Sequence, residues 1–278
     1  MHMETLKKKT YELRRDIVKM IYKSKAGHIG GDLSVIDILA TLYYKVMKTG
    51  PDKINDPDRD RFILSKGHCA DALYVVLGDK GYFDKNEVLE NFSAFGSRFI
   101  GHPNMDVPGI EINSGSLGHG LSVGTGMAIA GKMDKKDYRV YVVLGDGEMA
   151  EGSNYEAMMA AGHYKLDNIC ATVDYNGLQI SGKTDEVMDS GSLSGKFREF
   201  GWNVIEVADG NDCNQLEAAY QAAEKYKGKP SVVIARTVKG KGISYMENNE
   251  KWHHGVMKQE QYEQAIKEIN EVLDEYNN

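Results

Sequence analysis

Runs of β-branched and aliphatic residues alternate along this chain with stretches of helical periodicity. The runs predicted as strands are residues 61–64, 138–144, 168–173, 203–207 and 231–238. Continuous apolar runs of this kind are typical of strands buried on both faces, as in parallel sheets. The helical stretches over 151–164 and 214–227 are long enough to cross over between parallel strands. The chain is therefore predicted to have an α/β fold, a mostly parallel sheet with helices on both faces.

Further helices are expected around this sheet. Their predicted ranges are 3–24, 34–46, 84–92, 119–132 and 258–275, from apolar residues at helical spacing. Ser34 is expected to cap the second of them. No repeat, low-complexity tract or linker divides the 278 residues, and a chain of this length can bury one large core. A single domain over residues 1–278 is predicted.

The composition excludes several classes of protein. The formal net charge of −7 argues against a general nucleic-acid-binding protein, which would carry a basic surface. No apolar run approaches the roughly 20 residues that cross a bilayer, so no contact with a membrane is expected. Three cysteines, Cys69, Cys170 and Cys213, form no CxxC pair. That pattern fits a reducing compartment, and a cytoplasmic location is predicted.

The most informative motif follows the apolar run over 138–144. Gly145, Asp146, Gly147 and Glu148 come directly after it, and Asn176 follows the next predicted strand. The carboxyl ends of neighbouring parallel strands meet at one edge of a sheet, where ligands bind. One carboxylate and one amide oxygen suit a hard cation such as Mg²⁺ or Ca²⁺, with phosphate oxygens completing its coordination. A metal-diphosphate site is predicted here.

Histidines form the second informative pattern. Four follow a glycine in predicted loops or at helix starts, and two more precede Gly255; these are His28, His68, His102, His119, His253 and His254. Glycine lets the backbone approach a ligand closely, and imidazole can bind phosphate or hydroxyl groups and move protons near neutral pH. A pocket for a phosphorylated polyhydroxy ligand is therefore expected. Zinc is not favoured because no CxxC or HxxxH spacing occurs, and His163 is expected to lie at a helix end.

Together these motifs resemble transketolases, which are thiamine-diphosphate enzymes. The segments that carry the resemblance are residues 25–33, 65–68, 101–103, 115–120, 145–152 and 237–242, in the family's order. It extends from about residue 10 to residue 257. The resemblance implies that thiamine diphosphate is held through Mg²⁺ or Ca²⁺, with Asp146, Asn176 and the main-chain carbonyl of Leu178 as metal ligands.

The resemblance also implies roles for other residues. His28 and His102 would line the substrate channel as catalytic residues, and His68 would contact the diphosphate. The last histidine of the family's domain, catalytic and cofactor-binding, matches His254, with His253 as its neighbour. The cofactor-binding set is completed by residues of three further segments: Gly115, Leu117, Gly145, Gly147, Glu148 and Ile180. Glu151 and Glu156 match family glutamates between two cofactor sites, or else form an acidic first helical turn.

The transketolase resemblance implies an enzyme that passes a two-carbon ketol unit from a ketose phosphate to an aldose phosphate in the pentose phosphate pathway. The family's second domain, with the glutamate that activates the cofactor, has no counterpart in this sequence. The chain is therefore expected to be the N-terminal subunit of a split transketolase, inactive without a C-terminal partner that carries the pyrimidine-binding domain. A homodimer core or a heterotetramer is expected. A subunit of a related ketol-transferase or deoxyxylulose-phosphate-synthase-like enzyme, and a non-catalytic cofactor-binding module, are the alternatives.

Overall fold

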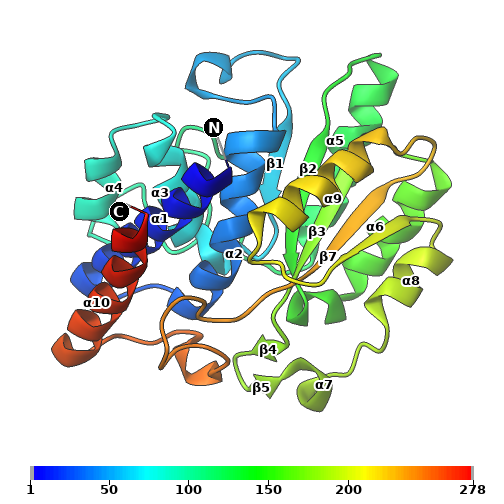
Figure 1. Cartoon of the computed structure of the whole chain (residues 1–278). Helices are drawn as coiled ribbons and strands as arrows, with labels where there is room; N and C mark the ends of the chain where they lie inside the picture. Colours follow the sequence, from blue (N-terminus) through cyan, green and yellow to red (C-terminus); the bar gives the residue numbers. More distant parts are fainter. Residues whose placement is uncertain (1–2, 277–278) are drawn as a thin grey trace.

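A five-stranded parallel sheet forms the centre of the molecule (Figure 1). The computed structural model describes residues 3–276. The strand order is β1 (Arg61–Leu64), β2 (Val140–Gly145), β3 (Ile169–Tyr175), β7 (Ser231–Arg236) and β6 (Asn203–Val207), and all four pairings are parallel. Solved transketolase structures share this architecture, as reported below. The predicted α/β class and the five predicted strands are confirmed, with ends shifted by one or two residues.

Helices cover both faces of the sheet. On one face α2 (Ile29–Thr41) and α9 (Cys213–Lys225) pack on the sheet, and Tyr141, Val143 and Cys170 point into their cluster. On this side the outer helices are α1 (Met3–Ser24), α3 (Ala70–Asp79), α4 (Lys85–Asn91) and α10 (Gln259–Glu275). The helices of the other face are α5 (His119–Met133), α6 (Gly152–His163) and α8 (Leu193–Glu199), against a second cluster that includes Val140, Val142 and Ala171. Alternate strand residues thus enter opposite clusters, as the pleat requires.

The prediction that Ser34 caps a helix over 34–46 is wrong. Helix α2 begins five residues earlier, at Ile29, and Ser34 is fully buried within it. The Ser34 hydroxyl donates to the main-chain oxygen of Gly31 and to Asp174 on β3. The helix ends at Thr41, and a π-helical turn over Leu42–Val46 follows. The two glycines after Ile29 hid the first turn, because glycine disfavours helix interiors.

Every β-strand that carries a predicted site residue ends at the same edge. Gly145 at the end of β2 pairs with Asp174 on β3, which pairs with Ala235 on β7. Beyond this edge lie a short hairpin, β4 (Leu178–Gln179) with β5 (Gly182–Lys183), and helix α7 (Thr184–Val187), at the bottom of Figure 1. None of the helices within residues 3–276 combines the length and the apolar character that a bilayer crossing requires.

Candidate active site

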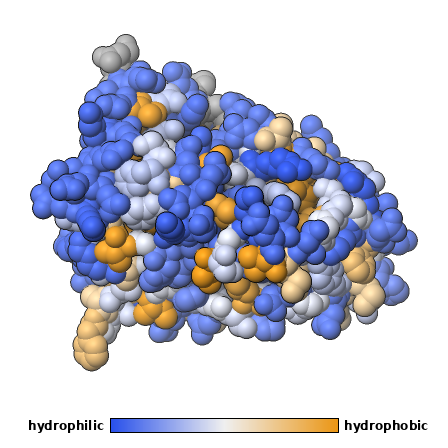
Figure 2. All heavy atoms as spheres, turned by 90° about the horizontal axis from the view of Figure 1, so that it is seen from below, coloured by the Kyte–Doolittle hydropathy of each residue, from blue (hydrophilic) through white to orange (hydrophobic). Residues whose placement is uncertain are grey.

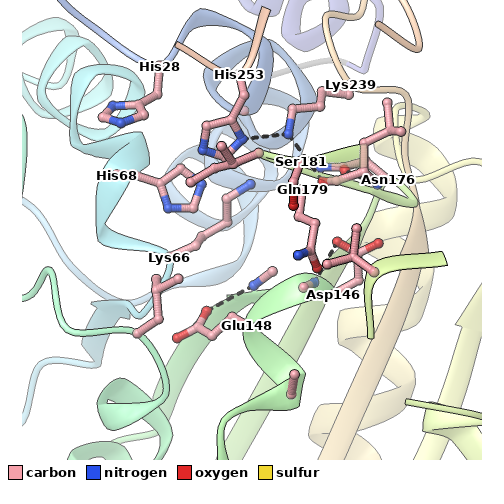
Figure 3. A pocket seen from close by; sticks show the side chains of 18 of the residues that line it. His28, Lys66, His68, Asp146, Glu148, Asn176, Gln179, Ser181, Lys239 and His253 are labelled. Carbon is pink, nitrogen blue, oxygen red and sulfur yellow. Dashed lines mark hydrogen bonds between the residues drawn. The ribbon is translucent and has the colours of Figure 1, made fainter. Parts of the chain in front are cut away.

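A cavity of about 790 Å³ opens at the carboxyl ends of the strands. Its walls come from the N-terminus of α2, the turn after β1, the loop before α5, the turns after β2 and β3, α7, and the segment after β7. Figure 3 shows these side chains converging from segments that are far apart in the sequence. The volume lies within the range of roughly 300–1,000 Å³ typical of cofactor and substrate sites.

Asp146 stands where β2 ends and a 3₁₀ turn over Gly147–Ala150 begins. Its carboxylate accepts the main-chain N–H of Gly147 at 3.0 Å and that of Gly177 at 2.6 Å. The second bond joins the turn after β2 to the turn after β3. Burial, and then the charge of Asp174, raise the pKa of Asp146 to about 6. A cation at this carboxylate would offset that cost and favour the ionised form.

Asn176 is held by its neighbours on both sides of its amide. Its Nδ2 donates to the Ser34 hydroxyl at 3.2 Å, and its Oδ1 accepts the main-chain N–H of Leu178 at 3.1 Å. The Leu178 carbonyl accepts from the Lys239 ammonium at 3.1 Å. The Asn176 oxygen and the Leu178 carbonyl therefore lie together beside Asp146, whose carboxylate bonds the intervening Gly177. These three are the oxygens that the sequence nominated as metal ligands.

Two buried lysines reach the cavity, and the sequence analysis gave neither a role. Lys66 forms an ion pair with Asp174, and Lys239 donates to Leu178 and to Nδ1 of His253, the latter at 2.8 Å. Burial lowers the pKa of Lys66, but Asp174 outweighs that effect and the net shift is upward. Burial and the charge of Lys66 lower the pKa of Lys239 to about 8. Cations in this setting would bind an anion strongly, because little water screens them.

Five histidine rings gather at the other side of the cavity. The His28 ring lies at the centre, with ring centroids at 5.4 Å from His68, 6.0 Å from His102, 5.7 Å from His253 and 4.8 Å from His254. Burial, then His254 and His102, lower the pKa of His28 to about 4. Burial and Lys239 lower the pKa of His253 to about 3, and burial and Lys66 hold that of His68 well below its usual value. These three imidazoles are neutral at pH 7.

Glu148 has a different environment from Asp146 although it lies two residues away. Its buried carboxylate accepts from the Ser65 hydroxyl, from the Gly118 N–H at 2.8 Å and from the Gly145 N–H at 3.0 Å. Burial raises its pKa. Because these three donors come from three segments, Glu148 ties the loop before α5 to the ends of β1 and β2. Its side chain also lines the cavity wall.

The structure brings together all but one of the nominated site residues. The nominated residues on the cavity wall are His28, His68, His102, Gly115, Leu117, Gly145, Asp146, Gly147, Glu148, Asn176, Leu178 and Ile180. His254 is exposed and packs its ring against His28, whereas the adjacent His253 lines the cavity. Glu151 lies on the wall and Glu156 is exposed on α6, while His163 is the last residue of that helix.

The wall chemistry fits a metal-bound diphosphate. One carboxylate, one amide oxygen and one carbonyl lie together, with two lysine ammonium groups close by. Hard oxygen ligands with few protein charges suit Mg²⁺ or Ca²⁺ shared with phosphate oxygens. In addition, Nδ1 of His28 is buried on the cavity wall without a hydrogen-bond partner. Such an atom calls for a ligand or water to satisfy it.

Comparison with known proteins identifies the family. The family described as "Transketolase, thiamine diphosphate binding domain" matches residues 7–271. The chain belongs to the transketolase family. One of the two subunits of the apulose-4-phosphate transketolase of Phocaeicola vulgatus is 50% identical over 274 residues, which are 99% of this chain and 97% of that protein. A 6-deoxy-6-sulfo-D-fructose transketolase subunit of a Clostridium species is 39% identical over 258 residues, covering 92% and 93%.

Longer transketolases contain this domain as one part. The crystal structure of transketolase from Campylobacter jejuni superimposes with a TM-score of 0.91 at 30% identity, over 97% of this chain and 43% of that one. The chain thus spans less than half of that transketolase, and nearly the whole of the two subunits named above. The transketolase family explains the shared sheet and the thiamine diphosphate binding domain. The roles of individual residues are proposals, developed next.

Proposed function

We propose that this chain is the diphosphate-binding subunit of a split transketolase and works with a separate subunit carrying the pyrimidine-binding domain. The observation that carries the proposal is the cavity in which Asp146, Asn176 and Leu178 lie beside Lys66 and Lys239. The length supports it too, because the relatives that are named as transketolase subunits match over almost their entire length.

Asp146, Asn176 and the Leu178 carbonyl would hold the cation, and the two lysines would neutralise the diphosphate. Thiamine diphosphate, when bound, supplies the reactive carbon that takes up the two-carbon unit. The Leu178 carbonyl now accepts from Lys239. Lys239 would therefore turn from this carbonyl toward phosphate oxygens when a cation arrives, since a cation and an ammonium compete for the same lone pairs.

The neutral histidines would handle the sugar. His28 is neutral at pH 7 and has a buried nitrogen free of hydrogen bonds on the cavity wall. It can accept a hydroxyl proton or donate to a carbonyl oxygen, depending on the tautomer. Nδ1 of His253 accepts from Lys239, which leaves its Nε2 as the protonated nitrogen. We therefore assign the cofactor-side role to His253, and keep His254 as a residue at the edge of the channel.

The donor substrate is proposed from the relatives. The relative that is 50% identical is named for apulose 4-phosphate, and a second relative is named for 6-deoxy-6-sulfofructose. We propose an apulose-4-phosphate-type donor in place of the donors of the pentose phosphate pathway. The chemistry would be the same in each case, because the two-carbon end of a ketose presents the same hydroxyl and carbonyl groups to the histidines.

A partner is expected to cover the cavity mouth. Three apolar side chains there are exposed: Ile180 by 74%, Met188 by 61% and Val187 by 41%. Figure 2 looks at the face that carries the β4–β5 hairpin and α7, and hydrophobic residues lie exposed on it among hydrophilic ones. Exposed apolar side chains around a ligand site mark a surface for another protein. A pyrimidine-binding subunit would cover them and complete the cofactor site.

The test uses the chain alone and mixed with a candidate pyrimidine-domain subunit, with thiamine diphosphate and Mg²⁺. Ketol transfer is measured with three donors: apulose 4-phosphate, 6-deoxy-6-sulfofructose and xylulose 5-phosphate. We expect activity only in the mixture, with the highest kcat/KM for apulose 4-phosphate, and loss of activity in Asp146→Ala. Activity of the chain alone would refute the split enzyme. No transfer from any donor, despite formation of the complex, would favour a non-catalytic cofactor-binding module.

A further inference from the structure

Two fully buried aspartates lie directly behind the histidine cluster, outside the cavity wall. Asp32 is in the first turn of α2, four residues after His28, and Asp71 is in the first turn of α3, three residues after His68. Neither residue belongs to the metal-diphosphate site, and neither forms an ion pair with a cation among the salt bridges of residues 3–276. Two carboxyl groups in such a place need a physical reason.

The contacts of the pair are specific. Oδ2 of Asp71 accepts the main-chain N–H of His28 at 3.0 Å, and Oδ1 of Asp32 accepts the main-chain N–H of Ala72 at 3.3 Å. The two carboxyl groups hydrogen-bond to each other. Their remaining oxygens, Oδ2 of Asp32 and Oδ1 of Asp71, receive no N–H or O–H from any other group within the described chain. The outer oxygens therefore face backbone donors, and the inner oxygens are left to each other.

An inner contact between two carboxyl oxygens requires a proton. Two carboxylates in a dry interior cannot both be ionised, so one group keeps its proton and donates it to the other. Burial raises the pKa of Asp71 to about 7, and burial with the nearby Asp71 raises that of Asp32 well above its usual value. The other ionisable groups that act on the pair are Lys66, which favours ionisation of Asp32, and Cys69.

The pair is packed against the backbone that presents His28. A Cβ added at Gly27 would lie 2.6 Å from Oδ2 of Asp71, so nothing separates the carboxyl group from this segment. Gly27 has φ of +141°, a conformation that side chains disfavour. The Asp71 carboxylate and the Gly27 backbone together fix where α2 begins, and with it the direction in which His28 enters the cavity.

We propose that Asp32 and Asp71 share one proton between their inner oxygens, and that this pair acts as a positioning device that sets the His28 imidazole in the substrate channel. The proposal rests on the proposed function for what His28 does to the substrate. Asp71 acts through the main chain of His28 and not on the substrate. The pair also joins the first turns of α2 and α3, and so it relates His28 to His68.

Counting donors gives a sharp test. In Asp32→Asn the amide oxygen accepts from Ala72 and the amide NH₂ replaces the shared proton. In Asp71→Asn the amide oxygen accepts from His28 and the NH₂ donates to the Asp32 carboxylate. Each single variant thus keeps one inner donor and one inner acceptor. The double variant places two NH₂ groups against each other, or turns one of them against a backbone N–H, and one buried donor is always left unpaired.

The experiment is a double-mutant cycle on the chain assembled with its partner subunit. We expect each single Asn variant to melt within about 2 °C of the wild type and the double variant to melt lower by about 4 °C or more. We expect kcat/KM for the ketose donor to fall by about tenfold or more only in the double variant, with the apparent affinity for thiamine diphosphate unchanged. A second readout is the carbethoxylation rate of His28 by diethyl pyrocarbonate, located by mass spectrometry. It should change only in the double variant, with His163, at the end of α6, as internal control.

Three results would overturn the proposal. Two ionised carboxylates would make the double variant at least as stable as the single variants, since each substitution would then relieve repulsion. A single Asn variant that loses as much as the double variant would exclude a shared proton. A double variant that melts early but keeps both its kcat/KM and the reactivity of His28 would exclude positioning. If the wild-type complex transfers no ketol unit, the proposed function fails, and the melting cycle and the His28 reactivity still decide the proposal.

Discussion

Replacing Lys66 by methionine tests how the floor of the cavity is balanced. The Lys66 side chain is 2% exposed and its partner Asp174 is 0% exposed, so Lys66→Met leaves a buried charge without its cation. Breaking such a pair costs about 3–5 kcal/mol. Asp174 keeps two hydroxyl donors, Ser34 and Thr237, and these hydrogen bonds to a charged group offset part of the loss. We therefore expect the free energy of unfolding to fall by about 3 kcal/mol.

The assay is urea unfolding at pH 7, supported by thermal melting. A loss of about 3 kcal/mol corresponds to a melting temperature lower by roughly 6–12 °C for a chain of this size. The matched control is Lys132→Met, whose partner Asp167 lies at 2.6 Å but whose side chain is 41% exposed. That pair should contribute less than about 1 kcal/mol. The double variant Lys66→Met with Asp174→Asn should recover most of the stability, because it removes the unpaired charge as well.

The reasoning would be refuted if Lys66→Met and Lys132→Met lost the same amount. Equal losses would mean that burial does not distinguish the two ion pairs, and hence that Asp174 is reached by water. A double variant as unstable as Lys66→Met would locate the loss in the packing of the lysine stem and not in the charge of Asp174. Either result would also remove the argument that Lys66 carries a poorly screened charge toward the diphosphate.

Three further predictions follow from single contacts. Ser34→Ala removes the acceptor for the Asn176 amide, and should weaken Mg²⁺-dependent cofactor binding about 10-fold, as for other groups that orient metal ligands; a titration in the assembled enzyme checks it. The pKa of His28 is about 4, below the unfolded value of about 6.5. Stability therefore rises with pH between these values, and His28→Asn should reduce that slope by up to about 1.4 kcal/mol per pH unit, measured by urea unfolding at pH 5 and 6. Gly162→Ala should destabilise by more than about 2 kcal/mol, since its Cβ would overlap the main-chain oxygen of Phe200; Gly152→Ala, with open space at its Cβ, is the control.

The fold could be predicted from the sequence where burial leaves a simple pattern. Strands β2, β3 and β7 are buried on both faces, so nearly all their residues are apolar, and the run over 138–144 needs no other signal. Helix α3 was missed because all but one of its residues are buried, which removes the polar face that gives a helix its periodicity. The β4–β5 hairpin was missed because two-residue strands leave no pattern.

The site could be predicted in composition but not in its electrostatics. Glycines next to His28, Asp146 and His102 mark close approaches of the backbone, and the family resemblance supplied the rest. Lys66 and Lys239 were overlooked because a lysine in a loop is usually a solvated charge. Each lies within three residues of the end of a strand of the sheet, Lys66 after β1 and Lys239 after β7, and that position was the available signal. The choice between His253 and His254 needs three dimensions, because adjacent residues point in different directions.

The two lysines also explain why one cavity can hold both an anion and a proton-transferring set of histidines. Lys66 and Lys239 lower the pKa of His68 and His253, so the charges that would attract a diphosphate keep the neighbouring imidazoles neutral. Neutral imidazoles can accept protons from sugar hydroxyls, which imidazolium cannot. A bound diphosphate would cancel part of the lysine charge, and the imidazole pKa would then rise toward neutrality. The histidines would thus become effective proton carriers only when the cofactor is in place, since catalysis favours a pKa near the working pH.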